Sequence, residues 1–378
     1  MSHKADGDIV LYAAGDVGPD RADPGSIFNH VTGVLSHGDI AFCQLEVNLS
    51  RRGVGPLGQE NARDPKIAAA IKEAGFNVVS FASNHCLDTG LDAFLDTIDN
   101  LKKQRLAVIG VGRNIEEART PAIIECKDTK VAFLAYNSIL KKDYWAEQNR
   151  PGCAPLRAWT LYEQIEPDAP GTPCRTHTFP YKDDLKAMAA DIRKAKSQAD
   201  LIIVSMHCGI HFAPAIIAEY QREIAHAAID SGADLILQHH AHILKGIEIY
   251  AGKVIFYGLC NFALEVHFMT KEFTQSTRFK EVEKNLKPDW NPPYPDYPSY
   301  PFHPDSRKTL LAKCVISKRG INKVSFLPVY INKQGEPEIL SPADERFGEV
   351  VRYMEEITRD QDMDTEFIIE GDEVIIIQ

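Results

Sequence analysis

The sequence lacks the long apolar segments and the paired cysteines that mark membrane-spanning and disulfide-stapled proteins. No run approaches the roughly 18 apolar residues that a transmembrane helix needs, so we expect no membrane insertion. The eight cysteines are scattered, the closest two stand 21 positions apart, and no CxxC pair is present. This spacing favours reduced thiols and a cytoplasmic location.

Basic residues are too few for a nucleic-acid-binding surface. The 378-residue chain has 42 Lys and Arg against 53 Asp and Glu, a formal net charge of −11. Neutralising the phosphates of nucleic acids or lipids requires clustered basic side chains, so we expect no nucleic-acid partner. The polar stretch Met1–Asp8 passes directly into an apolar strand, which leaves no room for a signal peptide and again favours the cytoplasm.

What the sequence does contain is a regular alternation of apolar runs with helix-like stretches, followed by hairpin pairs. This order predicts a mixed-sheet α/β domain. The predicted strands are Ile9–Ala14, Ile40–Leu45, Val78–Ala82, Leu106–Val111, Ala122–Cys126, Val131–Tyr136, Leu201–Met206, Ala233–Leu237, Ile243–Tyr250, Val254–Leu259, Leu310–Ser317, Lys323–Tyr330, Glu366–Glu370 and Glu373–Ile377. The predicted helices are Ile67–Ala74, Leu91–Gln104, Lys182–Lys196, Ala215–Asp230 and Phe347–Arg359.

Two irregular segments, at about 137–181 and 264–306, interrupt what we predict to be a single domain over residues 1–378. The second is rich in proline, since Pro288–Pro304 holds seven of the 22 prolines. Both segments carry aromatic side chains: Trp145, Trp159, Trp290, Tyr294, Tyr297 and Phe302. Two interpretations stay open, either lids that set specificity or surface loops that pack on the domain or form a homodimer contact.

Polar side chains follow five of the predicted strands, at the point where each ends. They are Asp16, Glu46, Asn84 with His85, His207, and the group His239, His240 and His242. In α/β sheets, ligands bind in the crevice at the carboxyl ends of the strands. Two carboxylates, an amide oxygen and three or more imidazoles form a mixed set that suits Mn, Fe or Zn better than Ca or Mg. The sequence therefore predicts a divalent-metal site.

Each of these residues taken singly also has a structural interpretation, as a turn residue, a strand end or a satisfied core histidine. The strongest single element is His240-x-His242, because alternate residues of an extended segment project to the same side. By the same alternation, we expect His239 to turn away from the metal.

The ordered motifs together resemble those of a known family. They are Gly15-Asp16, Gln44-Leu45-Glu46, Ser83-Asn84-His85 with Asp88-Thr89-Gly90, His207-Cys208-Gly209, His240-Ala241-His242, Tyr257–Phe262, Leu327-Pro328-Val329 and Gly335-Glu336-Pro337. From about residue 8 to about 359, the chain resembles the CapA/PgsA-type capsule or poly-γ-glutamate synthesis proteins, a branch of the calcineurin-like metallophosphoesterases. The resemblance implies a four-layer α/β/β/α sandwich of two mixed sheets with a dinuclear metal centre at one edge.

The resemblance also implies a role for each site residue. Glu46 would bridge two divalent ions, either Mn, Fe or Zn. Asp16 and His242 would hold one ion, and Asn84, His207 and His240 the other. His85, paired with Asn84 in the catalytic motif, would face the substrate and protonate the leaving group, because an imidazole exchanges a proton near neutral pH.

Several positions depart from the family pattern. Gly18 stands where ordinary phosphoesterases have a histidine, so one ion would have fewer protein ligands. His211 stands where family members commonly have a glutamate and is a candidate extra ligand or substrate contact. Asn261, within the Tyr257–Phe262 signature, is a further candidate. We interpret Cys86 and Cys208, which adjoin site residues, as small fillers rather than nucleophiles.

The function implied by the resemblance is that of a divalent-metal-dependent hydrolase in which the metals activate a water. A dinuclear site stabilises tetrahedral phosphorus and tetrahedral carbon alike, so the bond cleaved is either a phosphoester or a γ-glutamyl-type amide. The substrate would be a small phosphate-containing or glutamyl molecule. Two alternatives stay open: a non-catalytic assembly component of a poly-γ-glutamate synthesis complex with a structural metal site, and a binding module that holds an anion.

Overall fold

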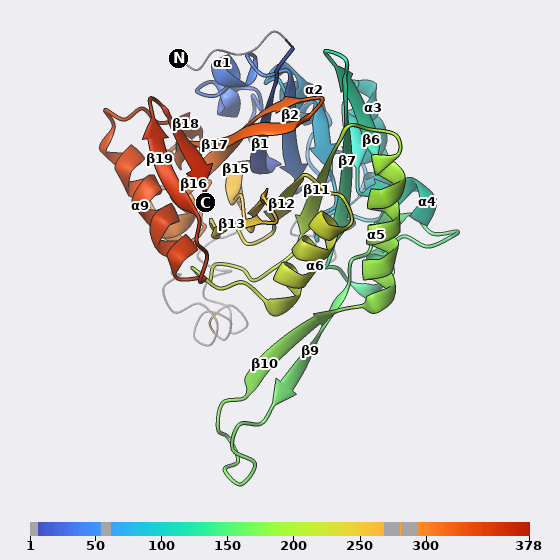
Figure 1. Ribbon diagram of the computed structural model, residues 1–378. Helices are drawn as coiled ribbons and strands as arrows, with labels where there is room; N and C mark the ends of the chain where they lie inside the picture. The colour runs from blue at the N-terminus through green and yellow to red at the C-terminus, as the bar shows by residue number, and fades with distance from the viewer. Residues whose placement is uncertain (1–6, 54–61, 268–279, 281–293) are drawn as a thin grey trace.

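Two mixed β-sheets face each other in the computed structural model, which describes residues 7–53, 62–267, 280 and 294–378 (Figure 1). Trp290 and the first part of the predicted proline-rich stretch, residues 288–293, lie outside the described residues. Phe42 of the first sheet and Phe133 of the second stack with nearly parallel rings, their centroids 6.4 Å apart. The space between the two sheets is therefore part of the hydrophobic core.

Parallel pairs form one half of the first sheet, and antiparallel pairs form the other half. Its strands in spatial order are β19 (Glu366–Glu370), β20 (Glu373–Ile377), β17 (Gly320–Ile331), β16 (Lys308–Ser317), β1 (Ile9–Gly18), β2 (Ile40–Leu45), β3 (Val78–Ser80) and β4 (Ala107–Ile109). Two further strands, β15 (Asn261–Leu264) and β18 (Pro337–Ile339), pair with β1 and β17. The run from β1 to β4 is parallel.

The second sheet is also parallel in its centre and antiparallel at both edges. Its strands in spatial order are β13 (Ile247–Tyr250), β14 (Lys253–Phe256), β12 (Leu235–His239), β11 (Leu201–His207), β7 (Thr129–Asn137) and β6 (Ala122–Cys126). Because β1 to β4 of the first sheet and the central strands of the second sheet are parallel, each sheet gathers the carboxyl ends of those strands on one side.

Amphipathic helices cover the outer faces of the sheets. The longer ones are α2 (Ile67–Glu73), α3 (Leu91–Lys103), α5 (Lys182–Lys196), α6 (Glu219–Asp230) and α9 (Glu345–Arg359), and the short ones are α1 (Thr32–Leu35), α4 (Ile115–Ala118), η1 (Ser26–Phe28), η2 (Lys142–Tyr144) and η3 (Pro304–Arg307). Helices α2 and α3 join the core of the first sheet, and α5 and α6 pack on the second. The predicted four-layer α/β/β/α sandwich is confirmed.

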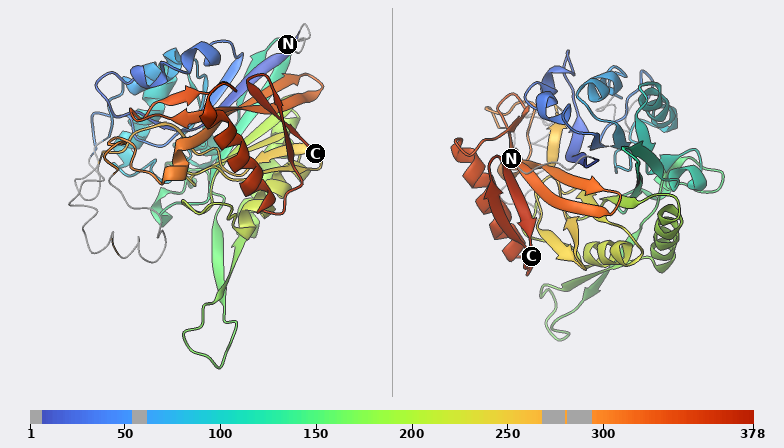
Figure 2. Two further views of the ribbon diagram at one scale, coloured as in Figure 1. Left: turned by 90° about the vertical axis from the view of Figure 1, so that its left-hand side faces the viewer. Right: turned by 45° about the horizontal axis from the view of Figure 1, so that its top comes forward.

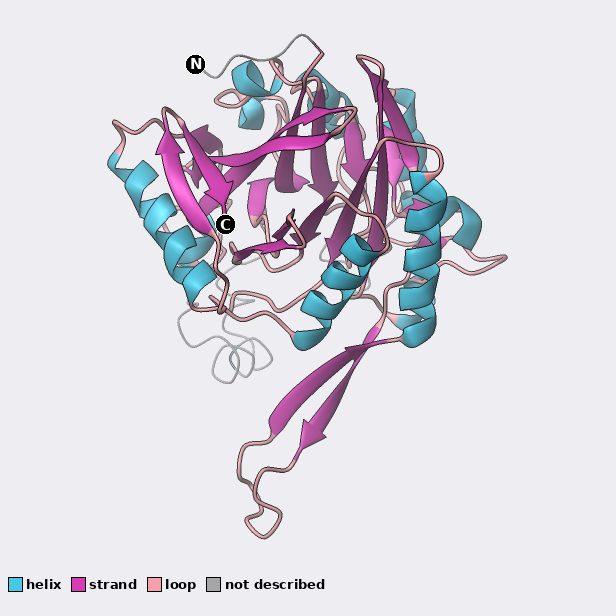
Figure 3. Ribbon diagram, in the orientation of Figure 1, coloured by secondary structure: helices cyan, strands magenta, loops and turns pink. Residues whose placement is uncertain are grey.

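The segment 137–181, predicted to be irregular, contains regular structure. A short strand β8 (Gly152–Cys153) pairs with β5 (Val111–Gly112), and β9 (Ala158–Glu163) forms a hairpin with β10 (Arg175–Pro180). Figures 2 and 3 show this hairpin standing clear of the two sheets. Most of its side chains are exposed on both faces, so the apolar alternation that identifies a half-buried strand is missing from the sequence.

Strand β1 continues four residues beyond its predicted end at Ala14 and changes partner on the way. Its first half pairs antiparallel with β16, and its end pairs parallel with β15. The change needs a glycine at position 15, because a Cβ there would collide with the carbonyl oxygen of Cys260. The backbone N–H of Asp16 then donates to that same oxygen at 3.0 Å, which fixes Asp16 at the sheet edge.

Candidate metal centre

Both sheets deliver polar side chains to a common point at the carboxyl ends of their strands. Asp16 lies near the end of β1, Glu46 directly follows β2, and His207 is the last residue of β11. All three side chains are buried, and donor atoms from them lie within 4.8 Å of one another. The structure therefore brings together residues that are up to 191 positions apart in the chain, as the motif order predicted.

Three further contacts build one half of the site around Asn84. Its Oδ1 atom lies 2.7 Å from His207 Nε2 and 3.2 Å from His240 Nδ1, and these two nitrogens are 3.2 Å apart. Glu46 Oε1 lies 3.7 Å from His207 Nε2. Ligand atoms that share one cation through bonds of about 2.1 Å are separated by roughly 3 to 3.5 Å, so this spacing fits a bound ion.

The other half of the site contains Asp16 and His242. His242 Nδ1 lies 3.3 Å from Asp16 Oδ2 and 2.7 Å from Asn261 Oδ1. Because an amide oxygen accepts hydrogen bonds, Nδ1 carries the proton in that contact, and Nε2, 3.9 Å from Glu46 Oε1, keeps its lone pair for an ion. Asn261, predicted as an additional site residue, is thus placed where it orients His242.

The carboxylates have the chemistry of a cation site. Both oxygens of Asp16 and Oε1 of Glu46 are buried and accept no hydrogen bond from the described residues. Burial raises the pKa of Glu46 well above its ordinary value, and the neighbouring charge of Asp16 adds to the rise. Burial also acts to raise the pKa of Asp16, but its contacts with His239 and His242 outweigh burial and hold it below the ordinary value. A divalent cation would remove the repulsion between the two carboxylates.

Two imidazoles of the site, those of His207 and His240, are held in their neutral form. Burial is the main cause that lowers the pKa of each well below the ordinary value; the charge of Asp16 opposes the shift at His207, and neighbouring imidazoles add to the shift at both. A neutral imidazole is the form that binds a metal ion. The donor set therefore fits a divalent ion such as Mn, Fe or Zn in both charge and ligand type.

His85 lies beside the donor cluster with its side chain 39% exposed. Its Nδ1 atom lies 2.6 Å from Asp88 Oδ2, and Asp88 Oδ1 lies 3.7 Å from Lys141 Nζ. Burial acts to raise the pKa of Asp88, but the contacts with His85 and Lys141 outweigh it and hold the pKa below its ordinary value. A carboxylate on Nδ1 orients the ring and leaves Nε2 to exchange a proton. The sequence showed Asp88 only as part of a motif, and its role was missed.

The histidines that follow β12 reach the site through a backbone conformation that differs from the predicted one. Strand β12 ends at His239, and the backbone then turns through left-handed conformations at His240 (φ 86°) and His242 (φ 52°). The two histidines converge from a turn, so the prediction of an extended segment was wrong. The prediction that His239 turns away was also wrong, since its Nδ1 lies 3.6 Å from Asp16 Oδ1.

Aromatic rings lie next to His240 and His242 at the border of the site. The His211 ring lies 3.8 Å from that of His240 and 5.2 Å from that of His242, between centroids. Phe212 and Phe302 lie 5.7 and 5.0 Å from the His242 ring. His211 is therefore placed where either predicted role, extra ligand or substrate contact, is geometrically open, and Phe302 brings the 264–306 segment to the site.

The cysteines beside the site are buried thiols. Cys86, Cys208 and Cys260 are fully or almost fully enclosed. Burial raises the pKa of each well above that of a free thiol, so each stays protonated near neutral pH. A protonated thiol is a weak nucleophile, which agrees with their interpretation as small fillers.

A buried lysine holds the loop that carries His211. Lys245 Nζ donates to the carbonyl oxygen of Ala213 and, at 2.9 Å, to that of Ile216. The side chain is 1% exposed, and burial lowers its pKa to about 7.

We expect the free energy of unfolding to carry a pH dependence that comes from Lys245. An unfolded lysine keeps its proton up to about pH 10.4, so between pH 7 and pH 10 the unfolded state binds more protons than the folded state. Stability therefore rises with pH in that window, by up to about 1.4 kcal/mol per pH unit. Urea unfolding at pH 7, 8 and 9 should show this rise for wild type and for the exposed control Lys72→Met, and a flatter profile for Lys245→Met. Parallel stability profiles for wild type and Lys245→Met would contradict this expectation.

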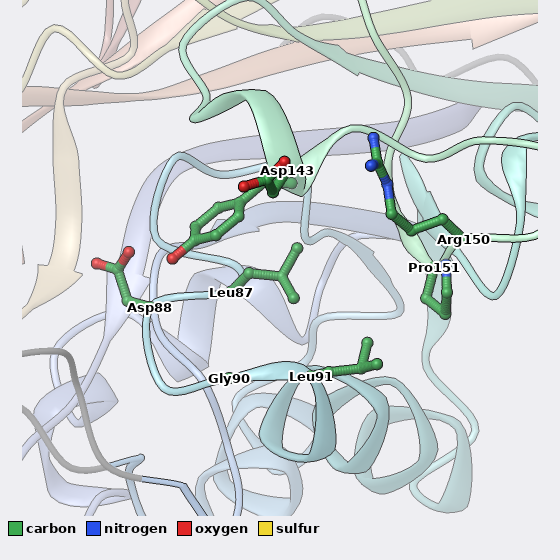
Figure 4. Close-up of a pocket in the computed structure, with 8 residues that line it drawn as sticks. Leu87, Asp88, Gly90, Leu91, Asp143, Arg150 and Pro151 are labelled. Carbon is green, nitrogen blue, oxygen red and sulfur yellow. The ribbon is translucent and has the colours of Figure 1, made fainter.

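A pocket of about 360 Å³ has in its lining Asp88, the residue that contacts His85 (Figure 4). Its lining residues are Leu87, Asp88, Gly90, Leu91, Asp143, Tyr144, Arg150 and Pro151. Asp88, which holds His85, lies at one end, and Arg150 lies at the other, with apolar side chains between them (Figure 4). The pocket thus offers an apolar surface beside Asp88, the residue that orients His85.

Comparison with known proteins places these residues in a family context. Residues 4–265 match the family model described as bacterial capsule synthesis protein PGA_cap. A PGA biosynthesis protein CapA of Bacillus subtilis is 29% identical over 55% of this chain and 47% of its own length. The capsule biosynthesis protein CapA of Bacillus anthracis is 29% identical over 63% and 54%. A probable polyglutamine synthesis accessory protein of Mycobacterium tuberculosis is 29% identical over 48% and 43%. The chain thus spans about half the length of these relatives.

Among solved structures, the calcineurin-like phosphoesterase YfkN of Bacillus subtilis aligns over 94% of this chain and 97% of that chain, at 14% identity and a TM-score of 0.37.

Within the described residues, no helix is both long and apolar enough to cross a membrane.

Proposed function

The chain belongs to the family of bacterial capsule synthesis proteins described as PGA_cap, and from this membership and the site geometry we propose that it is a divalent-metal-dependent hydrolase. The observation that carries the proposal is the buried convergence of Asp16, Glu46 and His207, with two carboxylates side by side and three of their oxygens accepting no hydrogen bond from the described residues. Such a cluster is costly without a cation, and it lies at the sheet edge where α/β proteins bind ligands.

In this proposal, one set of residues binds the metal ions and another donates the proton. Asp16, Glu46, Asn84, His207, His240 and His242 would hold two divalent ions, Mn, Fe or Zn. When bound, these ions would polarise the scissile group and lower the pKa of a water. Asp88 fixes the His85 ring, and His85 gives a proton to the departing group.

The substrate in this proposal carries either a phosphoester or a γ-glutamyl amide. A dinuclear site stabilises the tetrahedral transition state of both reactions. The relatives are named for PGA biosynthesis and capsule biosynthesis, which favours a substrate related to a capsule polymer. The loop with His211 and the aromatic rings of Phe212 and Phe302 would enclose the part of the substrate nearest the ions.

The experiment that tests the proposal is a hydrolysis assay on the metal-loaded protein. We expect turnover of a chromogenic phosphodiester, a phosphomonoester or a γ-glutamyl anilide in the presence of Mn²⁺, loss of turnover after chelation, and recovery on re-addition of the ion. Full metal occupancy without turnover of any of the three would contradict a hydrolase and favour the anion-binding alternative.

We further propose that the pocket beside His85 receives the leaving group. Leu91 lines it, is 47% exposed and is the first residue of α3, so Leu91→Trp should fill the pocket and leave the core untouched. We expect the variant to raise KM for p-nitrophenyl phosphate several-fold. Inhibition by inorganic phosphate, which has no leaving group, should be unchanged and serves as the control. An equal change in the KM for p-nitrophenyl phosphate and in the inhibition constant of phosphate would contradict binding of the leaving group in this pocket.

The second candidate function is that of a non-catalytic accessory component in polymer synthesis. The observation that favours it is the projecting β9–β10 hairpin, where Trp159, Leu161 and Tyr162 are exposed by 45%, 47% and 68%. In this alternative the metal would stabilise the fold only. Chelation would then lower the melting temperature strongly while no substrate is turned over.

A further inference from the structure

His239 is a buried histidine that the predicted ligand set leaves out. It is 1% exposed, and neither ring nitrogen has a hydrogen-bond partner among the described residues. One face of the ring packs on Phe42, with centroids 5.7 Å apart. Its Nδ1 atom lies 3.6 Å from Asp16 Oδ1. A buried imidazole whose ring nitrogens make no hydrogen bond within the described residues needs an explanation, and an ion bound between this ring and Asp16 is one.

The sheet register explains why His239 points into the site. Strands β11 and β12 are parallel, and His239 lies directly opposite His207 in their register. Residues opposite each other in neighbouring strands project to the same face of a sheet. His239 therefore enters the space between the sheets beside His207 and reaches Asp16.

The two halves of the site differ in how many protein donors they hold. The Asn84 half has three donors, from Asn84, His207 and His240, besides the shared Glu46. Among the described residues of the predicted ligand set, the Asp16 half holds Asp16 and His242.

The other nearby position, Gly18, has no room for a ligand. A Cβ at Gly18 would lie 2.8 Å from Leu264 Cδ1 and 2.9 Å from Val47 Cγ1, in apolar surroundings. Position 18 therefore supplies no further donor to the Asp16 half.

We propose that His239 Nδ1 is a ligand of the cation held at Asp16, so that this ion is bound by Asp16, His239 and His242 together with the shared Glu46. The carboxylate of Asp16 lies between two imidazoles, with His242 on the side of Oδ2 and His239 Nδ1 3.6 Å from Oδ1. Atoms that share a tetrahedral ion with bonds of about 2.1 Å stand roughly 3.4 Å apart, which is close to the distance between His239 Nδ1 and Asp16 Oδ1. The inference rests on the metal-dependent function proposed above.

The test counts bound ions in the absence of substrate. Wild-type protein loaded with Mn²⁺ and desalted should retain two ions per chain by elemental analysis. His239→Phe, which keeps the packing on Phe42, should retain one. His239→Leu, which also has no donor atom, should likewise retain one ion. Two ions in either variant would overturn the inference, and the distance from the ion to His239 Nδ1 in crystals separates ligation from mere orientation of Asp16.

Failure of the inference and failure of the proposed function give different results. No ion in the wild type would overturn both. Two ions in the wild type and two in either variant would overturn the role of His239 alone. If neither variant folds by circular dichroism, crystals of the wild type grown with Mn²⁺ decide. An ion beside Asp16 within about 2.5 Å of His239 Nδ1 supports ligation, and one beyond about 3 Å contradicts it.

Discussion

Replacing Glu46 with glutamine is expected to remove the metal and almost all hydrolysis. Glu46 is the carboxylate that faces both halves of the site, at 3.7 Å from His207 Nε2 and 3.9 Å from His242 Nε2. A neutral amide removes one negative charge from the donor set, so both ions should bind far more weakly. We expect kcat/KM in Mn²⁺ to fall by at least about 10³-fold, and elemental analysis after desalting to find less than one ion per chain.

The same variant separates a metal role from a structural one. Glu46 Oε2 accepts a hydrogen bond from Ser83 Oγ at 2.8 Å, and the glutamine oxygen can keep that contact. The substitution also ends the repulsion between Glu46 and Asp16, so the metal-free variant should melt at or above the temperature of the metal-free wild type. Glu125→Gln, an exposed change on β6, is the matched control. Full metal content and normal activity in Glu46→Gln would refute the assignment.

Replacing His85 with alanine is expected to impair turnover without loss of metal. The side chain lies outside the donor cluster and is oriented by Asp88. Loss of a general acid typically costs about 10²- to 10⁴-fold in rate. The loss of rate should lie near the upper end of this range for an alkyl phosphodiester, whose leaving group needs a proton. It should be much smaller for a nitrophenyl ester, whose leaving group departs as an anion.

The control for this variant is His37→Ala, which removes an exposed histidine whose ring contacts the carbonyl of Gly33. It should leave both rates unchanged. Steady-state kinetics on the two substrates, with metal content measured in parallel, checks the expectation. An equal loss on both substrates, or a loss of bound metal in His85→Ala, would show that His85 supports the metal site and does not donate a proton.

Much of the site could be predicted because its residues stand where buried strands end. Asp16, Glu46 and His207 each follow an apolar run, and parallel strands collect such positions at one edge. The order of motifs then identified which polar residues belong together. Local pattern and family likeness were enough to indicate these side chains.

What could not be predicted depends on backbone geometry and on neighbours in space. The positive φ angles at His240 and His242 are invisible in the sequence, and so the alternation argument misplaced His239. The register that sets His239 beside His207 exists only once the second sheet forms. The β9–β10 hairpin was missed because exposure on both faces leaves no apolar alternation to detect.

The most direct test of the central claim is the location of bound ions in crystals of the wild-type protein grown with Mn²⁺. We expect two anomalous difference peaks about 3.5 to 4 Å apart, one on each side of Glu46. One peak should adjoin Asp16 and His242, and the other Asn84, His207 and His240. An absence of peaks near Glu46 in a well-ordered, metal-saturated crystal would contradict the claim that these side chains form a metal centre.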